Sequence, residues 1–354
     1  MKHAVLIVSV MLLVTELSEG NEPPPLPDPT VYYALETDSV GVGRRANAAL
    51  VKRMVDSLVM TVTSKPTVAE AWKSLVKPDD VVGIKVSSGA GILGGTRPSV
   101  AEAVASGLRD AGLTKQQVIV WDRNLADLMA CGYRRDADTY TLAWIDPRDG
   151  YDSKAALSAP VLGKLIWGDS RFGERVGDRF SDMLSAPPQL SNKSYYAKIL
   201  STRISKVVHI PSATDSFLTG INGALAGMTL PNLDNWRRFT KAPEHGDPYL
   251  AEIYSDEMIR GKVLLTILDA LIVQYAGGPY ANPNFSVDKG AIYASKDPVA
   301  IDAILLDLVE EIRKESKLPS VRSMAGYIES AASLGLGTMP SSQTRAVRVG
   351  GEAP

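Results

Sequence analysis

The chain has 354 residues, of which 45% are hydrophobic and 22% are charged, and its formal net charge at pH 7 is −2. This composition is typical of a globular protein and excludes an intrinsically disordered chain. A charge so close to zero attracts neither nucleic acid nor an anionic membrane, so we expect neither as a partner. A chain of this length can bury a large core without cross-links, and its single cysteine, Cys131, excludes an intramolecular disulfide.

The first twenty residues have the pattern of a secretion signal. Lys2 comes before an apolar run from Ala4 to Val14, and the segment closes at Gly20. The run is shorter than the roughly 18 apolar residues that a membrane-spanning helix needs, and no later stretch approaches that length. We therefore predict a signal peptide over residues 1–20, no transmembrane segment, and a soluble mature protein that is exported to the periplasm or out of the cell.

The first half of the mature chain alternates between helix and strand patterns. Apolar residues at helical spacing predict helices, and short apolar runs between turn residues predict buried strands. Strand, helix and strand in succession predict a βαβ unit with parallel strands and a right-handed crossover. In chain order, the expected elements are helices over 47–62 and 68–76, a strand over 81–86, a glycine-rich loop over 87–95, a helix over 98–111 and a strand over 118–121.

The middle of the chain is irregular, and the alternation returns after it. Residues 139–145 and 161–167 are candidate strands of an insertion. Asp297 followed by Pro298 predicts a helix start, because the carboxylate can accept free N–H groups of the first turn and proline fits the first helical position. The later expected elements are a strand over 205–210, a glycine-interrupted helix over 219–228, a strand over 263–268 that closes on Asp269, and a strand over 290–295.

These elements predict an α/β fold: a mostly parallel sheet flanked by helices, with a smaller irregular insertion in the middle. We expect a linker and N-terminal extension over residues 21–46, which include a proline-rich stretch. A single domain is predicted over 47–337, with the insertion at about 135–200, followed by a flexible C-terminal tail over 338–354.

Several stretches of the sequence, taken in order, resemble one known family. They include AWKSLVKPDDVVGIKV from Ala71, VIVWDRNLADLMACGY from Val118, LTGINGAL from Leu218 and YASKDPVAIDA from Tyr293. Together they are similar to the domain of unknown function 362 family, over about residues 47–337. The resemblance implies an α/β fold but no established activity. Some members carry cysteine-rich iron–sulfur modules; this chain has one cysteine, so we expect no iron–sulfur cluster.

The chain departs from the family at polar positions. Where the family tends to have Asn after the IKV strand, this chain has Ser87. The family's Lys and His after the central strand, and its Lys-Asn after GAL, fall on Thr214, Ser216, Ala226 and Gly227. The resemblance therefore transfers no catalytic residue to this chain.

Polar residues come at the ends of several predicted strands. In an open parallel sheet, ligands bind beyond the carboxyl ends of the strands. Lys85, Asp122, His245 and Asp269 are the candidate catalytic residues, and Asp122 with Asp269 is a candidate pair for a divalent metal. The alternative for each Asp is a turn or a cap, and the alternative for Lys85 is a buried lysine paired with one of them.

The glycine-rich loop and the helix after it suit an anion, because free backbone N–H groups and the helix dipole point outward there. An arginine can hold a carboxylate or phosphate with two parallel hydrogen bonds. The candidate ligand-binding residues are Gly94, Thr96, Arg97, Arg123, Thr219, Asn222, Gly277 and Gly278.

Gly89 to Gly94 also spells G-x-G-x-x-G after a strand, the pattern of a dinucleotide-binding loop. Two features disfavour it. The helix is expected only from Pro98, after the motif, and Asp122 lies well beyond the roughly 20 residues at which the pattern places its acid. An exported protein also meets little free dinucleotide, so a dinucleotide-binding oxidoreductase is the least favoured hypothesis.

We expect Cys131 to be structural and His209 to be a core histidine with satisfied hydrogen bonds. The leading functional hypothesis is an exported protein that binds a small anionic ligand at the carboxyl edge of the sheet, with a divalent metal and catalysis left open. The alternative is a non-catalytic envelope binding or interaction module that associates through residues 236–239. The sequence indicates neither a cofactor nor an oligomeric state.

Overall fold

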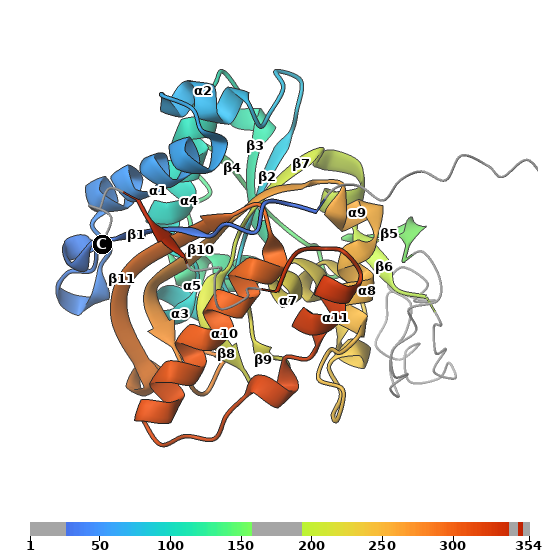
Figure 1. The fold of residues 1–354 in the computed structure, drawn as a ribbon. Coiled ribbons are helices and arrows are strands. Elements are labelled where there is room, and N and C mark those ends of the chain that lie inside the picture. The colour runs from blue at the N-terminus through green and yellow to red at the C-terminus, as the bar shows by residue number, and fades with distance from the viewer. Residues whose placement is uncertain (1–25, 158–192, 340–345, 350–354) are drawn as a thin grey trace, which may run out of the picture.

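The computed structural model describes residues 26–157, 193–339 and 346–349 (Figure 1). Ten strands of this part of the chain form one sheet, and two more form a small separate sheet. The large sheet contains β1 (Tyr32–Leu35), β2 (Val82–Val86), β3 (Val118–Asp122), β4 (Thr141–Trp144), β7 (Lys206–Ile210), β8 (Ser212–Ser216), β9 (Gly220–Ile221), β10 (Val263–Gln274), β11 (Ser286–Ser295) and β12 (Val347–Arg348). The small sheet contains β5 (Tyr151–Ala156) and β6 (Tyr195–Ala197).

The middle of the large sheet is parallel. β4, β3, β2, β7 and β10 lie side by side in this order and run the same way, so their carboxyl ends meet at one edge. β11 runs antiparallel to both β10 and β1, and β12 pairs in parallel with β1. The predicted fold class, a mostly parallel sheet flanked by helices, is confirmed.

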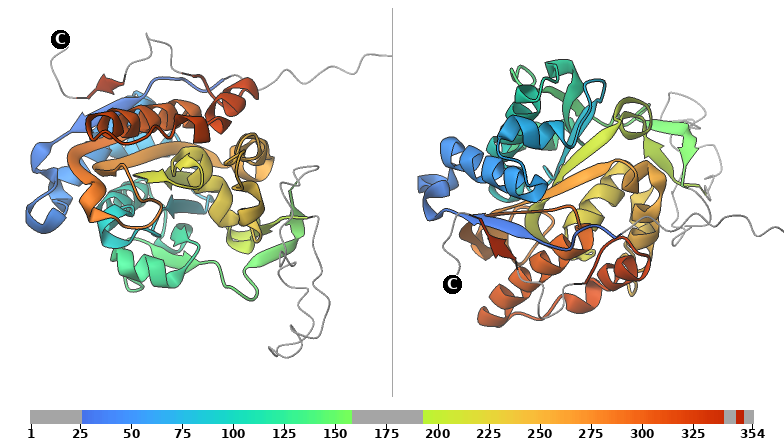
Figure 2. Two further views of the ribbon diagram at one scale, coloured as in Figure 1. Left: turned by 90° about the horizontal axis from the view of Figure 1, so that it is seen from below. Right: turned by 45° about the horizontal axis from the view of Figure 1, so that its top comes forward.

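Helices cover both faces of the large sheet (Figure 2). α1, α2 and α4 contribute to the core on one face, whereas α7, α8, α10 and α11 contribute to the core on the other. The described helices are α1 (Ala48–Thr63), α2 (Val68–Lys73), α3 (Gly91–Gly94), α4 (Pro98–Asp110), α5 (Leu125–Cys131), α7 (Ala224–Thr229), α8 (Tyr249–Ser255), α9 (Glu257–Arg260), α10 (Pro298–Glu315) and α11 (Tyr327–Ser333). None of them is long and apolar enough to cross a membrane.

Strand β2 contributes to both cores because its side chains alternate between the two faces. Val82, Ile84 and Val86 are fully buried in the core beneath α1 and α4. Gly83 faces the opposite side, where a Cβ atom would come within 2.4 Å of the Trp121 ring. Glycine at this position therefore lets the indole of Trp121 pack across the strand.

The helix predicted from Asp297 and Pro298 is α10, and its predicted cap is confirmed. The Asp297 carboxylate accepts a hydrogen bond from the Ala300 backbone N–H at 2.9 Å, and Pro298 is the first helical residue. The carboxylate also accepts a bond from the Thr338 N–H at 2.7 Å. The cap therefore also fixes the chain that follows α11.

The predicted domain boundaries are wrong at both ends. Residues 21–46 were expected to be a linker and residues 338–354 a flexible tail, but β1 pairs with β11 and β12 pairs with β1. Strands of four and two residues are too short to show a period-two pattern, so the sequence does not reveal them. The domain begins before residue 47.

One predicted helix begins later than expected, and one predicted strand ends later than expected. The helix predicted over 219–228 begins only at Ala224, because the residues before it form β9. The strand predicted to close on Asp269 continues to Gln274, because β8 pairs with its second half and extends the sheet there. Asp269 is therefore inside a strand and not at its end.

The predicted insertion at about 135–200 begins later than expected. β4 falls in that range but pairs with β3 in the main sheet, whereas β5 and β6 form the separate sheet that lies at one side of the molecule (Figure 1). The strand predicted over 161–167 lies outside the described residues.

A buried carboxylate joins α10 to α7. Asp302 accepts hydrogen bonds from the backbone N–H groups of Ala224 and Leu225, the second at 3.0 Å, at the first turn of α7. Gly223 comes directly before this turn, and a Cβ atom there would overlap the Asp302 carboxylate. Burial raises the pKa of Asp302 from its ordinary value of 3.8 to about 7, although the two backbone N–H groups act in the opposite direction.

Asp302→Asn should change the pH dependence of stability. With its raised pKa, Asp302 favours the folded state fully below about pH 4, and this contribution is lost as the pH rises to about 7. The amide does not titrate and keeps one acceptor oxygen for α7. Urea unfolding from pH 4 to 8 should show the variant gaining stability relative to wild type as the pH rises. Glu315→Gln, an exposed change on the same helix with no ion pair among the described residues, is the control. A slope in Asp302→Asn identical to that of wild type would contradict the expectation.

Candidate functional site

A pocket of about 200 Å³ opens at the carboxyl edge of the parallel strands. Its polar lining comes from residues that end or follow β2, β3, β7 and β8. Its apolar lining comes from the segments after β2 and β8, from α7 and the residues that follow it, and from the loop after β10. The polar lining includes Lys85, Ser87, Asp122, Arg123, Asn124, Asp127, Ser212, Ser216, Thr219 and Asn222. The apolar lining includes Ala90, Leu218, Ala226, Leu230, Pro231, Trp236, Pro279 and Tyr280.

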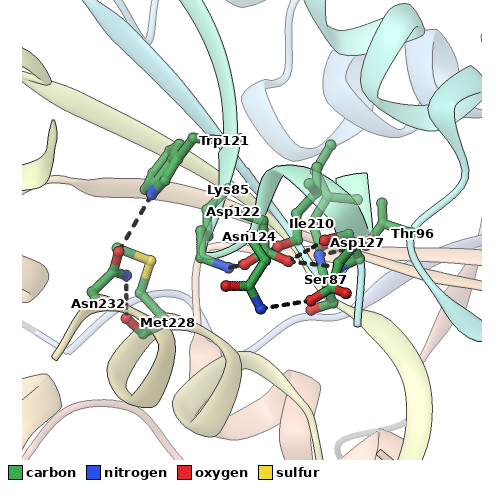
Figure 3. Close-up of polar contacts among 12 residues, drawn as sticks. Lys85, Ser87, Thr96, Trp121, Asp122, Asn124, Asp127, Ile210, Met228 and Asn232 are labelled. Atoms are coloured by element: carbon green, nitrogen blue, oxygen red, sulfur yellow. Dashed lines mark hydrogen bonds and ion pairs between the residues drawn. The ribbon is translucent and has the colours of Figure 1, made fainter. Parts of the chain in front are cut away.

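Lys85 and Asp122 form a buried ion pair at the base of this pocket (Figure 3). The Lys85 ammonium donates to Asp122 Oδ1 at 2.8 Å and to the carbonyl oxygen of Val86 at 2.7 Å. The other carboxylate oxygen accepts from the Ser88 N–H at 2.7 Å and from the Ser88 hydroxyl at 2.6 Å. The pair therefore joins the ends of β2 and β3 and fixes the first turn of the loop between them.

Asp122 is ionised in this environment. Burial alone would raise the pKa of its carboxyl, but the charge and hydrogen bond of Lys85, with the two bonds from Ser88, outweigh burial and lower the pKa below 3.8. Of the alternatives open for Lys85, the structure shows a buried lysine paired with Asp122. Each charge is balanced within the chain.

His209 lies beside Lys85 in the next strand, where the two residues are paired in register. Its ring is fully buried, and neither nitrogen has a hydrogen-bond partner in the described part of the chain. Burial and the charge of Lys85 lower the pKa of His209 well below 6.5, so the ring is neutral. The prediction of a core histidine is confirmed, but the described residues do not satisfy its hydrogen bonds as predicted. Gly227 of α7 packs closely against the ring.

Asp269 and Arg97 lie outside the pocket lining, in a second buried ion pair. The Asp269 carboxylate accepts from the Arg97 backbone N–H at 2.8 Å and from its guanidinium at 3.2 and 3.3 Å. Arg97 is the residue directly before α4. An internal carboxylate therefore occupies the position at the start of α4 where the sequence predicts an external anion.

The structure does not bring Asp122 and Asp269 together as a metal site. Each carboxylate has its own cationic partner, and the described residues contain no cluster of three or more His, Cys, Asp or Glu side chains that could hold a metal ion. His245 is also outside the pocket lining; its Nδ1 lies 3.1 Å from the carbonyl oxygen of Leu218, a lining residue. Of the four candidate catalytic residues, only Lys85 and Asp122 meet.

Of the candidate ligand-binding residues, some line the pocket and others do not. Thr219 and Asn222 line the pocket. Thr96 is buried, and its hydroxyl bridges the ends of two strands by donating to the carbonyl oxygen of Ile210 and accepting from the N–H of Ser87. Gly94 and Gly278 are packed in the interior, the second with its N–H donating to Asp215, and Gly277 is an exposed turn residue.

Arg123 is the candidate ligand-binding arginine that lines the pocket. Its guanidinium carbon lies 5.9 Å from the centre of the Tyr151 ring and 5.8 Å from that of the Trp236 ring, within the range of cation–π contacts. One N–H donates to the carbonyl oxygen of Leu233 at 3.1 Å. Tyr151 belongs to β5, so the small sheet helps to position this pocket residue.

The segment 236–239 does not form the exposed surface that the alternative hypothesis needs. Arg238 and Phe239 are fully buried, and Trp236 faces the pocket beside Arg123. Cys131 is buried as well, and burial raises the pKa of its thiol to about 12, which confirms a structural role.

Sequence reasoning missed several lining residues. Ser212 and Ser216 are the first and last residues of β8, which begins two residues after the end of the predicted strand over 205–210. The hydroxyl-rich run SATDS at this place was a signal in the sequence. Trp236 and Tyr280 carry no such signal, because they reach the pocket from loops far away in the sequence.

Breaking the Lys85–Asp122 pair should be costly. Asp122→Asn leaves a buried ammonium without its counter-charge, and loss of one partner of a buried pair costs roughly 3–5 kcal/mol. Lys85→Met combined with Asp122→Asn removes both charges and keeps an acceptor for Ser88. Urea unfolding at pH 7 should show the double variant to be more stable than Asp122→Asn alone. Losses that simply add would show that the two charges are not coupled.

No family model and no curated protein matches the chain. Among solved structures, the chain is distantly similar to a crystal structure of a Thermotoga maritima protein, with 12% identity and a TM-score of 0.37. The match covers 77% of this chain and 60% of that chain, so this chain spans less than two thirds of the Thermotoga protein's length. A likeness this weak identifies no function.

Proposed function

We propose that the chain binds a small anionic ligand in the pocket at the carboxyl edge of its sheet. The observation that carries this proposal is Arg123. Among the described residues, no carboxylate lies within ion-pair distance of its guanidinium, although it is partly buried between two aromatic rings. Burial lowers the pKa of Arg123 below its ordinary value of 12.5. Asp122 and Asp234 stabilise this charge from a distance, and a bound anion would give the guanidinium the direct ionic partner that the described residues do not supply.

Neutral hydrogen-bonding groups around the pocket support the same proposal. The side chains of Ser87, Ser212 and Asn222 line it, and none makes a hydrogen bond to another residue of the described ranges. Two hydroxyls and one amide can each donate to an oxygen atom of a ligand. Arginine adds a planar donor group that suits carboxylate or phosphate.

The pocket gives little support to a dinucleotide ligand. Its volume of about 200 Å³ is below the roughly 300–1,000 Å³ typical of sites for drug-sized molecules, and a dinucleotide is larger than these. Asp122, the acid that would contact a ribose, already accepts bonds from Lys85 and Ser88. Because both candidate metal carboxylates are also engaged, we propose no metal. Binding is the function that the lining supports, and we assign no catalytic step.

Arg123→Ala should weaken binding of small anions. Charge-assisted hydrogen bonds contribute about 1.5–3 kcal/mol, which corresponds to roughly 10- to 100-fold in affinity. The measurement is calorimetry or thermal shift with acetate, phosphate and sulfate at low ionic strength. Arg123→Lys should retain part of the affinity, because it keeps the charge but loses the planar donor group. Arg134→Ala, an exposed change outside the pocket, should bind as wild type does; equal affinity in Arg123→Ala would refute the proposal.

We also propose that the protein is exported and is a member of the domain of unknown function 362 family. The first rests on the signal pattern over residues 1–20, and the second on the motifs from Ala71 to Ala303. N-terminal sequencing of protein purified from the medium or the periplasm should find a mature chain that begins near Asn21. A chain that stays in the cytoplasm and begins at residue 1 or 2 would contradict export.

A further inference from the structure

Part of the pocket lining is apolar, and a small inorganic anion would make no favourable contact with it. Besides the polar strand ends, its lining includes Leu218, Leu230, Trp236, Pro279 and Tyr280. A ligand that filled the pocket with oxygen atoms alone would place some of them against these groups and lose hydrogen bonds to water. The polar and apolar parts of the lining together suit a molecule that is polar at one end and apolar over the rest.

Exposed aromatic rings continue the apolar lining at the pocket mouth. Tyr280 is 67% exposed and Phe217 is 55% exposed, and their ring centres lie 6.4 Å apart. The backbone beneath them is fixed, because the Phe217 N–H donates to the carbonyl oxygen of Gly278 at 3.0 Å and the carbonyl oxygen of Tyr280 accepts from Gln274 at 2.8 Å. The two rings therefore form a preformed apolar rim.

The volume of the pocket limits the size of the ligand. An apolar cavity of roughly 150 Å³ is large enough to hold benzene. At about 200 Å³, the pocket has room for a six-membered ring with one small substituent. A group of this size fills the enclosed space, which a bare inorganic ion would leave largely empty.

We infer that the ligand is an aromatic monocarboxylate of about the size of benzoate. Its carboxylate pairs with Arg123, and its ring lies against the rim of Tyr280, beside the Trp236 ring that the guanidinium groups of Arg123 and Arg237 already contact. Aromatic pairs gain stabilisation beyond the area that they bury, which favours a flat aromatic ring over an aliphatic ring of similar size. The inference rests on the proposed function, because it assumes that the anion binds at Arg123.

Four probe molecules, measured by calorimetry or thermal shift, separate the contribution of the carboxylate from that of the aromatic ring. Benzoate carries both the ring and the charge; acetate carries the charge alone, benzyl alcohol the ring alone, and cyclohexanecarboxylate a non-aromatic ring with the charge. Benzoate should bind at least tenfold more tightly than acetate or benzyl alcohol, and more tightly than cyclohexanecarboxylate. Acetate binding as well as benzoate would overturn the inference and leave the proposed function standing. Benzyl alcohol binding as well as benzoate would overturn the proposed function, and binding of none of the probes would overturn both.

Variants at the rim provide the second test. Tyr280→Ala should weaken benzoate severalfold and leave acetate unchanged, whereas Tyr280→Phe should bind benzoate as wild type does. The Tyr280 side chain is largely exposed, so neither change should unfold the protein. Ile92→Ala is the matched control, because Ile92 is an exposed apolar residue outside the pocket lining. Unchanged benzoate affinity in Tyr280→Ala, or an equal loss in Ile92→Ala, would overturn the assignment of the ring to the apolar lining.

Discussion

The arrangement of the chain at the carboxyl edge of the sheet depends on the ion pair between Lys85 and Asp122. A largely buried charge pair is stable only when the remaining donors and acceptors are also satisfied. Here the carbonyl oxygen of Val86 and two groups of Ser88 complete the set. Because Ser88 is held against Asp122, the chain that leaves β2 follows one path. That path places Ser87 and Ala90 in the pocket wall.

The charged side chains at the carboxyl edge of the sheet differ in whether they have a partner within the chain, and the proposed anion binding follows from this difference. Three carboxylates near the edge are engaged within the chain: Asp122 by Lys85, Asp269 by Arg97, and Asp215 by the Gly278 N–H at 2.9 Å. Arg123 has no carboxylate partner among the described residues, and aromatic rings flank it instead. Asp127, a further carboxylate in the lining, accepts from the Asn124 amide at 2.8 Å and has no ion-pair partner among the described residues. Arg123 is therefore the lining cation that a bound anion can pair with.

The sequence predicts the elements that repeat a pattern and misses the contacts that form between distant segments. β2, β3 and α10 were predictable because their apolar spacing, or the cap of Asp297, is local. β12 and the pocket residues Trp236 and Tyr280 were not, because their roles depend on which loops the sheet order brings together. The same limit applies to Lys85: its burial was readable from an apolar strand, but the choice of Asp122 over Asp269 as its partner depends on strand register.

The pairing of Asp269 with the chain before α4 also bears on how glycine-rich motifs are interpreted. In this chain the segment from Gly89 to Gly94 contains the short helix α3, so the predicted glycine-rich loop is only partly a loop. It leads to α4, whose start is neutralised by a side chain 172 residues away. The Asp269 carboxylate therefore occupies the place at the start of α4 where a ligand phosphate could otherwise bind. A glycine-rich motif that binds a nucleotide and one whose following helix is capped by an internal carboxylate can have the same local sequence. Only the distant acidic residue distinguishes them.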